Sequence, residues 1–468
     1  MMLLVVLTLA STIRAAEPPD LGSSDLIAYN INVEQELGRA FNTALHTQYD
    51  LNYDPDVVTY IRKIGHEIAS QTGTPRAFRF YVIDNPSINA FAGPNGIVGI
   101  HTGLILAVQS EDELAAVIAH EIAHVTQNHL SRGHEINQKQ GSLSTIATLL
   151  AAILIGMHDS TAIYPTLIAG MSLNIERQLK NSRLYESEAD HIGIKFLNQS
   201  GYNPHAMSRF FERLAKKNQY NTFQIPEILR SHPVTERRIE EAENRAQNLT
   251  AQYVKKSNNH LSLIQLKLKN DLKNQIINDT TLSLTPGESC YQQNLQTLSK
   301  NSPPPLSQLR CLQEMEKQHP HQFLYTTLLL NTVTKHPLTP AFTAQIISQA
   351  EYLLALNPNN TALLLSYTKL LLSLNKKQQA ITLLMQHTDQ QRYTYQIYKT
   401  LSEIYASQQK QTEAYYFLAL AQFDIGNIKR TLYLLKQAKI TANATLKQHI
   451  ALFEHKNKNL LKNKKYKE

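Results

Sequence analysis

The chain has 468 residues, 42% of them hydrophobic and 18% charged, which fits about two to four folded domains and excludes a chain that is disordered throughout. It contains only two cysteines, so a disulfide scaffold and a cysteine-ligated zinc cluster are excluded, and a metal site would have to use His, Asp or Glu. The net charge of +8 comes largely from a lysine-rich tail over the last thirteen residues. Because no basic stripe with interleaved aromatic residues occurs elsewhere, we do not expect nucleic-acid binding.

The N-terminus has the pattern of an export signal. Residues 1–10 are almost entirely apolar, and the small residues Ala15 and Ala16 follow them. The apolar run suits the core of a signal peptide but is too short to cross a bilayer, which takes about 20 residues. We therefore expect a signal peptide over residues 1–16 and an exported mature protein.

The segment after residue 54 contains one helical pattern and then strand patterns. Apolar residues keep helical spacing over residues 55–69. Residues 78–83 alternate as a strand does, and residues 88–92 and 96–100 have the composition of two more short strands. The first half of the chain is therefore predicted to be α+β, with a small sheet and helices around it.

Two longer helices are predicted after the strands. Ser110 and Glu113 form a capping-box sequence, which predicts a helix over about residues 111–130. A further helix is predicted over residues 183–199, because Gly201 suits the position that follows a helix end.

Beyond about residue 250 the patterns indicate helices alone. Similar residues recur 34 positions apart, in the pairs Leu364 and Tyr398, Leu371 and Tyr405, Ala380 and Ala414, and Leu384 and Leu418. Stacked helical hairpins need a small residue at the close helix contact, and this period resembles that of tetratricopeptide repeats. Generic antiparallel helices are the alternative. We predict one domain over residues 17–250 and an all-α domain over residues 251–468 that ends in the basic tail.

The most informative motif is His120-Glu121-Ile122-Ala123-His124 within the helix predicted over residues 111–130. Histidines four positions apart project from one face of a helix, so both imidazoles can bind one metal ion. Glu121 lies about 100° round the helix and could act on a water molecule without binding the metal itself. The pattern therefore predicts a metal site with a general base beside it.

A catalytic zinc site needs a third protein ligand. The metzincin spacing would place a histidine at position 130, which is Leu130, and His129 is one residue off, so that class is rejected. The second helix offers Glu186 and Asp190, four positions apart on one face. Glu186 can then bind the metal while Asp190 accepts a hydrogen bond from a ligand histidine, and Glu188 is expected to face solvent.

Together these motifs resemble a known family. The two helical motifs, the segment Asn89–Ala92 and the segment Ser231–Arg238 are similar to those of the metallopeptidases of the CAAX prenyl endopeptidase and heat-shock HtpX group, over about residues 50–245. The resemblance implies a mostly helical gluzincin-type α+β metallopeptidase domain, followed by an all-α tetratricopeptide-like solenoid.

The resemblance also implies a site and a function. One Zn²⁺ would be held by His120, His124 and Glu186, with Glu121 as general base and Asp190 behind a ligand histidine. The implied protein is a periplasmic zinc endopeptidase that degrades misfolded or stalled envelope proteins and assists outer-membrane protein assembly, with the β-barrel assembly machinery as a partner. The alternative is an assembly factor or chaperone that binds clients through the repeats without proteolysis.

Two further segments have both a functional and a structural interpretation. His232 is either a turn residue or lies at the active-site mouth, where it would stabilise the oxyanion or occupy the open zinc position in a latent state, with Arg238 bracing the loop. Asn89, Ala90 and Phe91 form either an edge strand that pairs with extended substrate or an internal strand.

The apolar residues between 143 and 173 form two runs, each too short to span a bilayer as a helix. A core helix, a mobile lid over the cleft and an insertion that contacts a membrane or a partner remain open. Cys290 and Cys311 flank the turn expected at residues 302–305, and an oxidising compartment favours a disulfide between them.

Overall fold

The structure is a computed structural model. It describes residues 31–135, 175–220, 226–250, 252, 259–272, 284–300, 302–388 and 394–461. The expected signal peptide over residues 1–16, the apolar segment 143–173 and residues 462–468 of the basic tail lie outside these ranges. Within the described ranges, no helix combines the length and apolar character that a membrane crossing requires.

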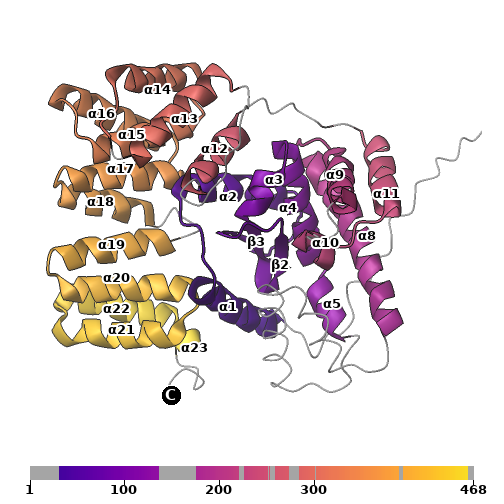
Figure 1. Ribbon diagram of the computed structural model, residues 1–468. Helices are drawn as coiled ribbons and strands as arrows, with labels where there is room; N and C mark the ends of the chain where they lie inside the picture. The colour runs from indigo at the N-terminus through magenta and orange to yellow at the C-terminus, as the bar shows by residue number, and fades with distance from the viewer. Residues whose placement is uncertain are drawn as a thin grey trace, which may run out of the picture.

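The first half of the chain folds into a small sheet with helices around it (Figure 1). Its elements are α1 (Ile31–Gln48), α2 (Pro55–Ala69), β1 (Arg79–Ile83), β2 (Ala90–Gly93), the 3-10 turn η1 (Pro94–Gly96), β3 (Ile97–His101), α3 (Thr102–Ala107), α4 (Glu111–Thr126), α5 (His129–Glu135), α8 (Ile175–Gln199), α9 (Ala206–Tyr220), α10 (Glu227–Ser231) and α11 (Glu236–Gln247).

The three strands are arranged in the order β1–β3–β2, with β3 parallel to β1 and antiparallel to β2. Among the described residues β2 therefore lies at an edge of the sheet. Phe91 of β2 pairs with Gly99 of β3, and a Cβ at Gly99 would lie 2.0 Å from the Phe91 ring, so this position has no room for a side chain. The predicted strands are confirmed, with boundaries shifted by one or two residues.

Helix α4 begins as predicted but ends early. The Ser110 side chain accepts a hydrogen bond from the backbone N–H of Glu113, 3.2 Å away, and so caps the helix. The expected continuation to residue 130 is wrong, because α4 ends at Thr126. Asn128 has a φ of 57°, a left-handed conformation that a helix cannot continue through, and α5 starts at the next residue.

Helix α4 is the centre of this half of the molecule, and it packs against α2, α8, α9 and β2. Helix α8 begins at Ile175, earlier than predicted, and ends before Gly201, which has the expected positive φ of 75°. Helices α4 and α8 approach closely at Gly193, where a Cβ would lie 3.2 Å from the backbone N and Cα of His120. A glycine at this position lets the two helices place their polar residues opposite each other.

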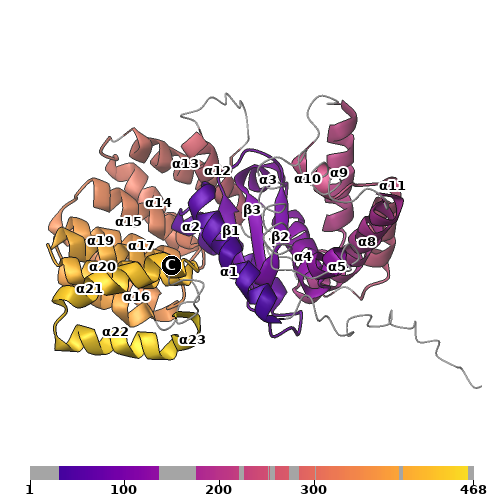
Figure 2. The same ribbon diagram turned by 90° about the horizontal axis from the view of Figure 1, so that it is seen from below.

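The second half of the described chain is helical throughout. Its elements are α12 (His260–Leu272), α13 (Pro286–Ser299), α14 (Leu306–Gln318), α15 (Phe323–Lys335), α16 (Pro340–Leu356), α17 (Thr361–Ser373), α18 (Lys377–Thr388), α19 (Tyr395–Ser407), α20 (Gln411–Asp424), α21 (Ile428–Thr441), α22 (Ala444–Lys456) and α23 (Lys458–Leu461). Figure 2 shows these helices stacked on one side, the sheet with α1 and α2 in the middle, and α8, α9 and α11 on the other side.

The 34-residue spacing is reflected in the helix boundaries. Helices α19 and α20 begin 34 residues after α17 and α18, respectively. The small residues Ala380 and Ala414 are both buried, as close helix contacts require. The structure also joins Cys290 of α13 to Cys311 of α14 in a disulfide.

The two halves share one hydrophobic core. A continuous cluster of buried apolar side chains extends from Val57 on α2 to Leu420 on α20, and α2 packs directly against α17. Polar contacts add to this docking, since the Asn42 side chain of α1 donates to the carbonyl oxygen of Asp424, 3.3 Å away. The second half thus docks on α1 and α2 of the first half.

Candidate metal centre

Three polar residues project from α4 into the protein interior. The exposed fractions of His120 and Glu121 are 5% and 1%, and the apolar residues between them and His124 are fully buried. The Nε2 atoms of His120 and His124 are 3.0 Å apart, as the i and i+4 spacing predicts for one helix face. Burial of this many polar groups is unfavourable unless each has a partner or a ligand.

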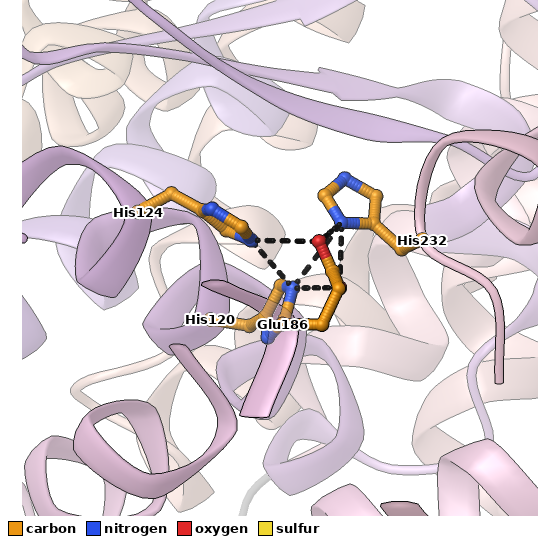
Figure 3. A group of neighbouring side chains, drawn as sticks. All are labelled: His120, His124, Glu186 and His232. Atoms are coloured by element: carbon orange, nitrogen blue, oxygen red, sulfur yellow. Dashed lines mark hydrogen bonds and ion pairs between the residues drawn. The ribbon is translucent and has the colours of Figure 1, made fainter. Parts of the chain in front are cut away.

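Two more side chains complete a cluster around these nitrogens (Figure 3). Glu186 of α8 places one carboxylate oxygen 3.4 Å from His120 Nε2 and the other 3.5 Å from His124 Nε2. His232, directly after α10, places Nδ1 3.0 Å from both Glu186 oxygens. One ligand atom from each of the four residues lies within 4.8 Å of the others.

This donor set fits a divalent metal ion. Two imidazoles and a carboxylate with a fourth nitrogen are the ligand types that zinc takes, and the four atoms converge on one point between three elements. Both carboxylate oxygens of Glu121 are buried without a hydrogen-bond partner among the described residues. A buried carboxylate without a hydrogen bond beside such a cluster is expected where a ligand or water normally binds.

Asp190 and Arg238 support His120 from behind. His120 Nδ1 is 3.0 Å from Asp190 Oδ1, on the opposite side of the ring from the cluster. Arg238 donates two hydrogen bonds to the Asp190 carboxylate, at 2.7 and 2.8 Å. Burial would lower the pKa of His120, but the contacts with Asp190 and Glu186 outweigh it and raise the pKa to about 10.

The carboxylates of Glu186 and Asp190 are held in the charged form. Burial raises the pKa of Glu186, but the neighbouring His232 and His124 lower it by more. The pKa of Glu186 therefore lies well below the usual range. The pKa of Asp190 is also lowered, because the hydrogen bonds from Arg238 and His120 outweigh burial. Burial dominates at His124 and brings its pKa well below that of a free histidine.

The loop after α10 lies against the cluster through two residues. The Nε2 atom of His232 is 3.7 Å from Glu121 Oε1, so this ring lies between the general-base candidate and Glu186. Arg238 Nη1 donates to the carbonyl oxygen of Pro233, 2.9 Å away, and lies 3.1 Å from Glu186 Oε2. Arg238 thus connects the His232 loop to α8.

His129 and Glu188 occupy positions that the sequence did not predict. His129 Nδ1 is 2.9 Å from His124 Nδ1, and His129 Nε2 is 3.1 Å from Glu188 Oε2. Arg132 Nη1 also donates to Glu188, at 3.0 Å. The Glu188 side chain is 34% exposed, so it faces solvent in part, as expected, but it also pairs with His129 and Arg132, which was not expected. One signal for this contact was present in the sequence, because His129 follows His124 by only five residues. The contact itself depends on the left-handed conformation of Asn128.

The other residues singled out in the sequence lie outside this cluster. Asn89 precedes β2, and Ala90 and Phe91 are part of this edge strand, which packs along α4. Cys290 and Cys311 are in the second half of the chain, on α13 and α14.

Comparison with known proteins identifies the fold that carries this site. Residues 55–246 match the model of peptidase family M48. The chain is 39% identical to a putative beta-barrel assembly-enhancing protease of Vibrio cholerae, over 49% of this chain and 47% of that protein. It is 34% identical to the beta-barrel assembly-enhancing protease of Escherichia coli K12, over 56% and 54% of the two chains.

A mitochondrial metalloendopeptidase, OMA1 of Schizosaccharomyces pombe, is 30% identical over 41% of this chain and 53% of that protein. The chain thus spans about half the length of the curated relatives that it matches. The matched region contains α4, α8 and the His232 loop, and so all four residues of the cluster. Residues 55–246 are a metallopeptidase domain of family M48.

Proposed function

We propose that this protein is a zinc endopeptidase whose metal ligands are His120, His124 and Glu186. The observation that carries the proposal is the convergence of these side chains from two helices, beside a Glu121 carboxylate that has no hydrogen-bond partner among the described residues. Family membership supports a metallopeptidase, and the His, His, Glu donor set favours one zinc ion per chain.

Separate residues of the chain would then transfer the protons and orient the metal ligands. When bound, the metal would polarise the scissile carbonyl and make water more acidic. Glu121 takes a proton from the attacking water at its carboxylate and passes it to the leaving amine. Asp190 keeps His120 in the tautomer whose Nε2 faces the cluster, and Arg238 holds Asp190 in place.

We assign His232 as the fourth ligand of the metal, in the position that water or substrate would otherwise take. The structure would then correspond to a latent state of the enzyme. Its Nδ1 lies among the other ligand atoms, 3.4 Å from His120 Nε2 and 3.0 Å from the Glu186 oxygens. A ring there occupies the space that substrate and water need, so the loop must move before catalysis. Stabilisation of the oxyanion by His232 is the alternative role.

Substrate would enter as an extended segment along β2. This strand lies at an edge of the described sheet and packs along α4, which carries the site. The carbonyl oxygen of Asn89 is already used within the sheet, where it accepts from the backbone N–H of His101, 3.1 Å away. The segment of Asn89, Ala90 and Phe91 would pair with the substrate backbone through the groups that point away from β3, a mode of binding that tolerates many sequences. Such tolerance suits an enzyme that degrades misfolded or stalled proteins.

For the whole protein we propose a role in the periplasm, in the quality control and assembly of outer-membrane proteins. The names of the curated relatives from V. cholerae and E. coli support this role. We propose that residues 1–16 are a cleaved signal peptide, that residues 17–250 are the catalytic domain, and that residues 251–468 form a tetratricopeptide-like solenoid. The solenoid, supported by the 34-residue offset of successive hairpins, would bind unfolded clients and the β-barrel assembly machinery.

A second candidate function is client binding without proteolysis. The length of the helical second half favours it, because such stacked helices offer a large surface for partners. The general-base candidate Glu121 argues against it as the sole function, since a pure adaptor needs no such group.

Variants in the full-length protein would test the enzymatic role. Glu121→Gln should retain zinc but lose casein cleavage by at least about 100-fold, because it removes the proton acceptor. Wild-type turnover in Glu121→Gln would contradict the proposed mechanism.

His232→Ala should raise turnover if the ring blocks the fourth position, and lower it if the ring stabilises the oxyanion.

A further inference from the structure

His129 is a buried histidine that the proposed mechanism does not use. Its ring faces two polar groups: Nδ1 is 2.9 Å from Nδ1 of His124, and Nε2 is 3.1 Å from a carboxylate oxygen of Glu188. It also stacks on Tyr185 of α8, with ring centroids 4.6 Å apart. Each ring nitrogen therefore has one partner, and the aromatic contact fixes the plane of the ring.

The hydrogen-bond pattern allows one consistent arrangement of protons. Glu188 also accepts from Arg132, so its carboxylate is an acceptor and His129 Nε2 must donate to it. In a neutral His129 ring, Nδ1 is then an acceptor, and it accepts a hydrogen bond from the Nδ1–H group of His124. This leaves Nε2 of His124 with a free lone pair that points at the cluster formed by His120, Glu186 and His232.

The backbone that carries His129 is itself held in place. Asn128 turns the chain out of α4 through its positive φ of 57°, and Arg76 donates to the Asn128 side chain and to the carbonyl oxygen of Val125, each at 2.6 Å. Glu34 of α1 pairs with Arg76 at 2.9 Å. These contacts hold the turn after the His-Glu-x-x-His motif in the conformation that brings the His129 ring against His124.

On this basis we propose that His129 is a positioning residue for the metal ligand His124, and that Glu188 and Arg132 fix the His129 ring for this task. The arrangement parallels the one at the other ligand, where Asp190 and Arg238 lie behind His120. In each case Nδ1 of a ligand imidazole lies against a side chain of another element, and an arginine holds that side chain, directly for Asp190 and through Glu188 for His129. The inference rests on the proposed metal site.

The test is the zinc dissociation constant of the full-length protein, measured by competition with a chromogenic chelator. His129→Ala should weaken zinc binding about 10- to 100-fold, the effect usual for groups that orient a ligand histidine. His129→Asn should recover much of this loss, because its side-chain oxygen can accept from His124 Nδ1. In the Co²⁺-substituted protein, His129→Ala should also shift the visible absorption bands, since the orientation of a ligand ring changes.

Glu188 provides a second, independent variant. Glu188→Gln should weaken zinc binding by about 10-fold, and adding it to His129→Ala should cause little further loss, because both changes act through one contact chain. His205→Ala is the matched control: it removes a histidine that pairs with Glu243 at 2.9 Å, outside the metal cluster, and should bind zinc as the wild type does. Thermal unfolding of the metal-free variants checks that each one folds.

The outcomes separate this inference from the proposed function. If the wild type binds zinc and cleaves casein but His129→Ala and Glu188→Gln bind zinc as tightly as the His205→Ala control, the positioning role is wrong and the enzyme assignment stands. If His129→Ala does not fold, His129→Asn and Glu188→Gln decide the question by the same criterion. If the wild type binds no zinc, both the function and this inference fail.

Discussion

The residues of the metal cluster differ in how directly the sequence determines them. His120, Glu121 and His124 could be assigned from local spacing alone, because helix geometry fixes which side chains share a face. The spacing of Glu186 and Asp190 made them candidates, and the family resemblance added support, since spacing alone does not show that their distant helix meets the histidines. The partners of Glu188 could not be predicted, because they depend on the conformation of a single residue, Asn128.

The protonation of His120 leads to a prediction about pH. Its pKa is raised to about 10 without metal because Asp190 and Glu186 outweigh burial, so the ring is an imidazolium at neutral pH. A metal must displace this proton, and zinc affinity should therefore rise with pH, by about tenfold per unit, until the pH approaches 10. Isothermal calorimetry in buffers of different ionisation enthalpy should detect the released proton. Equal affinity at pH 6 and pH 9 would contradict this assignment.

At the scale of elements, the pairing of α4 with α8 determines whether a site exists. Glu186, Asp190 and Gly193 recur at helical spacing and so lie along the face of α8 that meets α4. The sequence predicted both helices, the start of α4 and the end of α8, but not the other two boundaries, because α8 begins before its predicted start and α4 ends just before the left-handed residue Asn128. Their close approach could not be predicted, since it depends on packing between distant segments.

Gly193→Leu tests this helix pairing. A larger side chain would meet the α4 backbone next to His120, so the helices must separate and Glu186 must move away from the imidazoles. We expect a loss of about 1–3 kcal/mol in the free energy of unfolding and at least about a tenfold weaker zinc affinity. Lys195→Leu places the same side chain on the exposed face of α8 and should change neither quantity appreciably. If both variants behave alike, contact at Gly193 does not position the site.

At the scale of the molecule, the two halves form one packed body rather than independent units joined by a linker. The shared core and the docking of α2 on α17 both indicate this. The sequence predicted a change from α+β to all-α structure near residue 250, and the described elements follow it. It could not predict the docking, because partners such as Asn42 and Asp424 are 382 positions apart.

A buried ion pair between the halves tests the strength of this docking. Lys267 of α12 pairs with Asp56 of α2 and lies 2.9 Å from Asp54, at the junction of the two halves. Lys267→Met should lower the free energy of unfolding by about 3–5 kcal/mol, because it leaves the Asp56 carboxylate buried and unpaired.

The double variant Lys267→Met, Asp56→Leu should lose less, since neither charge remains buried. Lys439→Met is the surface control, because Lys439 and Glu454 form an exposed pair and its loss should change stability by less than about 1 kcal/mol. Urea unfolding measures all three variants. Equal losses at Lys267 and Lys439 would show that the buried pair does not hold the halves together.

The central claim is that residues from α4 and α8 bind a single metal ion. Its most direct test is the metal content of the purified protein by inductively coupled plasma mass spectrometry, for the wild type, Glu121→Gln and Glu186→Ala. We expect about one zinc per chain in the wild type and in Glu121→Gln, and a large loss in Glu186→Ala, because Glu186 is assigned as a metal ligand and Glu121 is not. A wild type without bound metal, or a Glu186→Ala variant that keeps its zinc, would contradict the account.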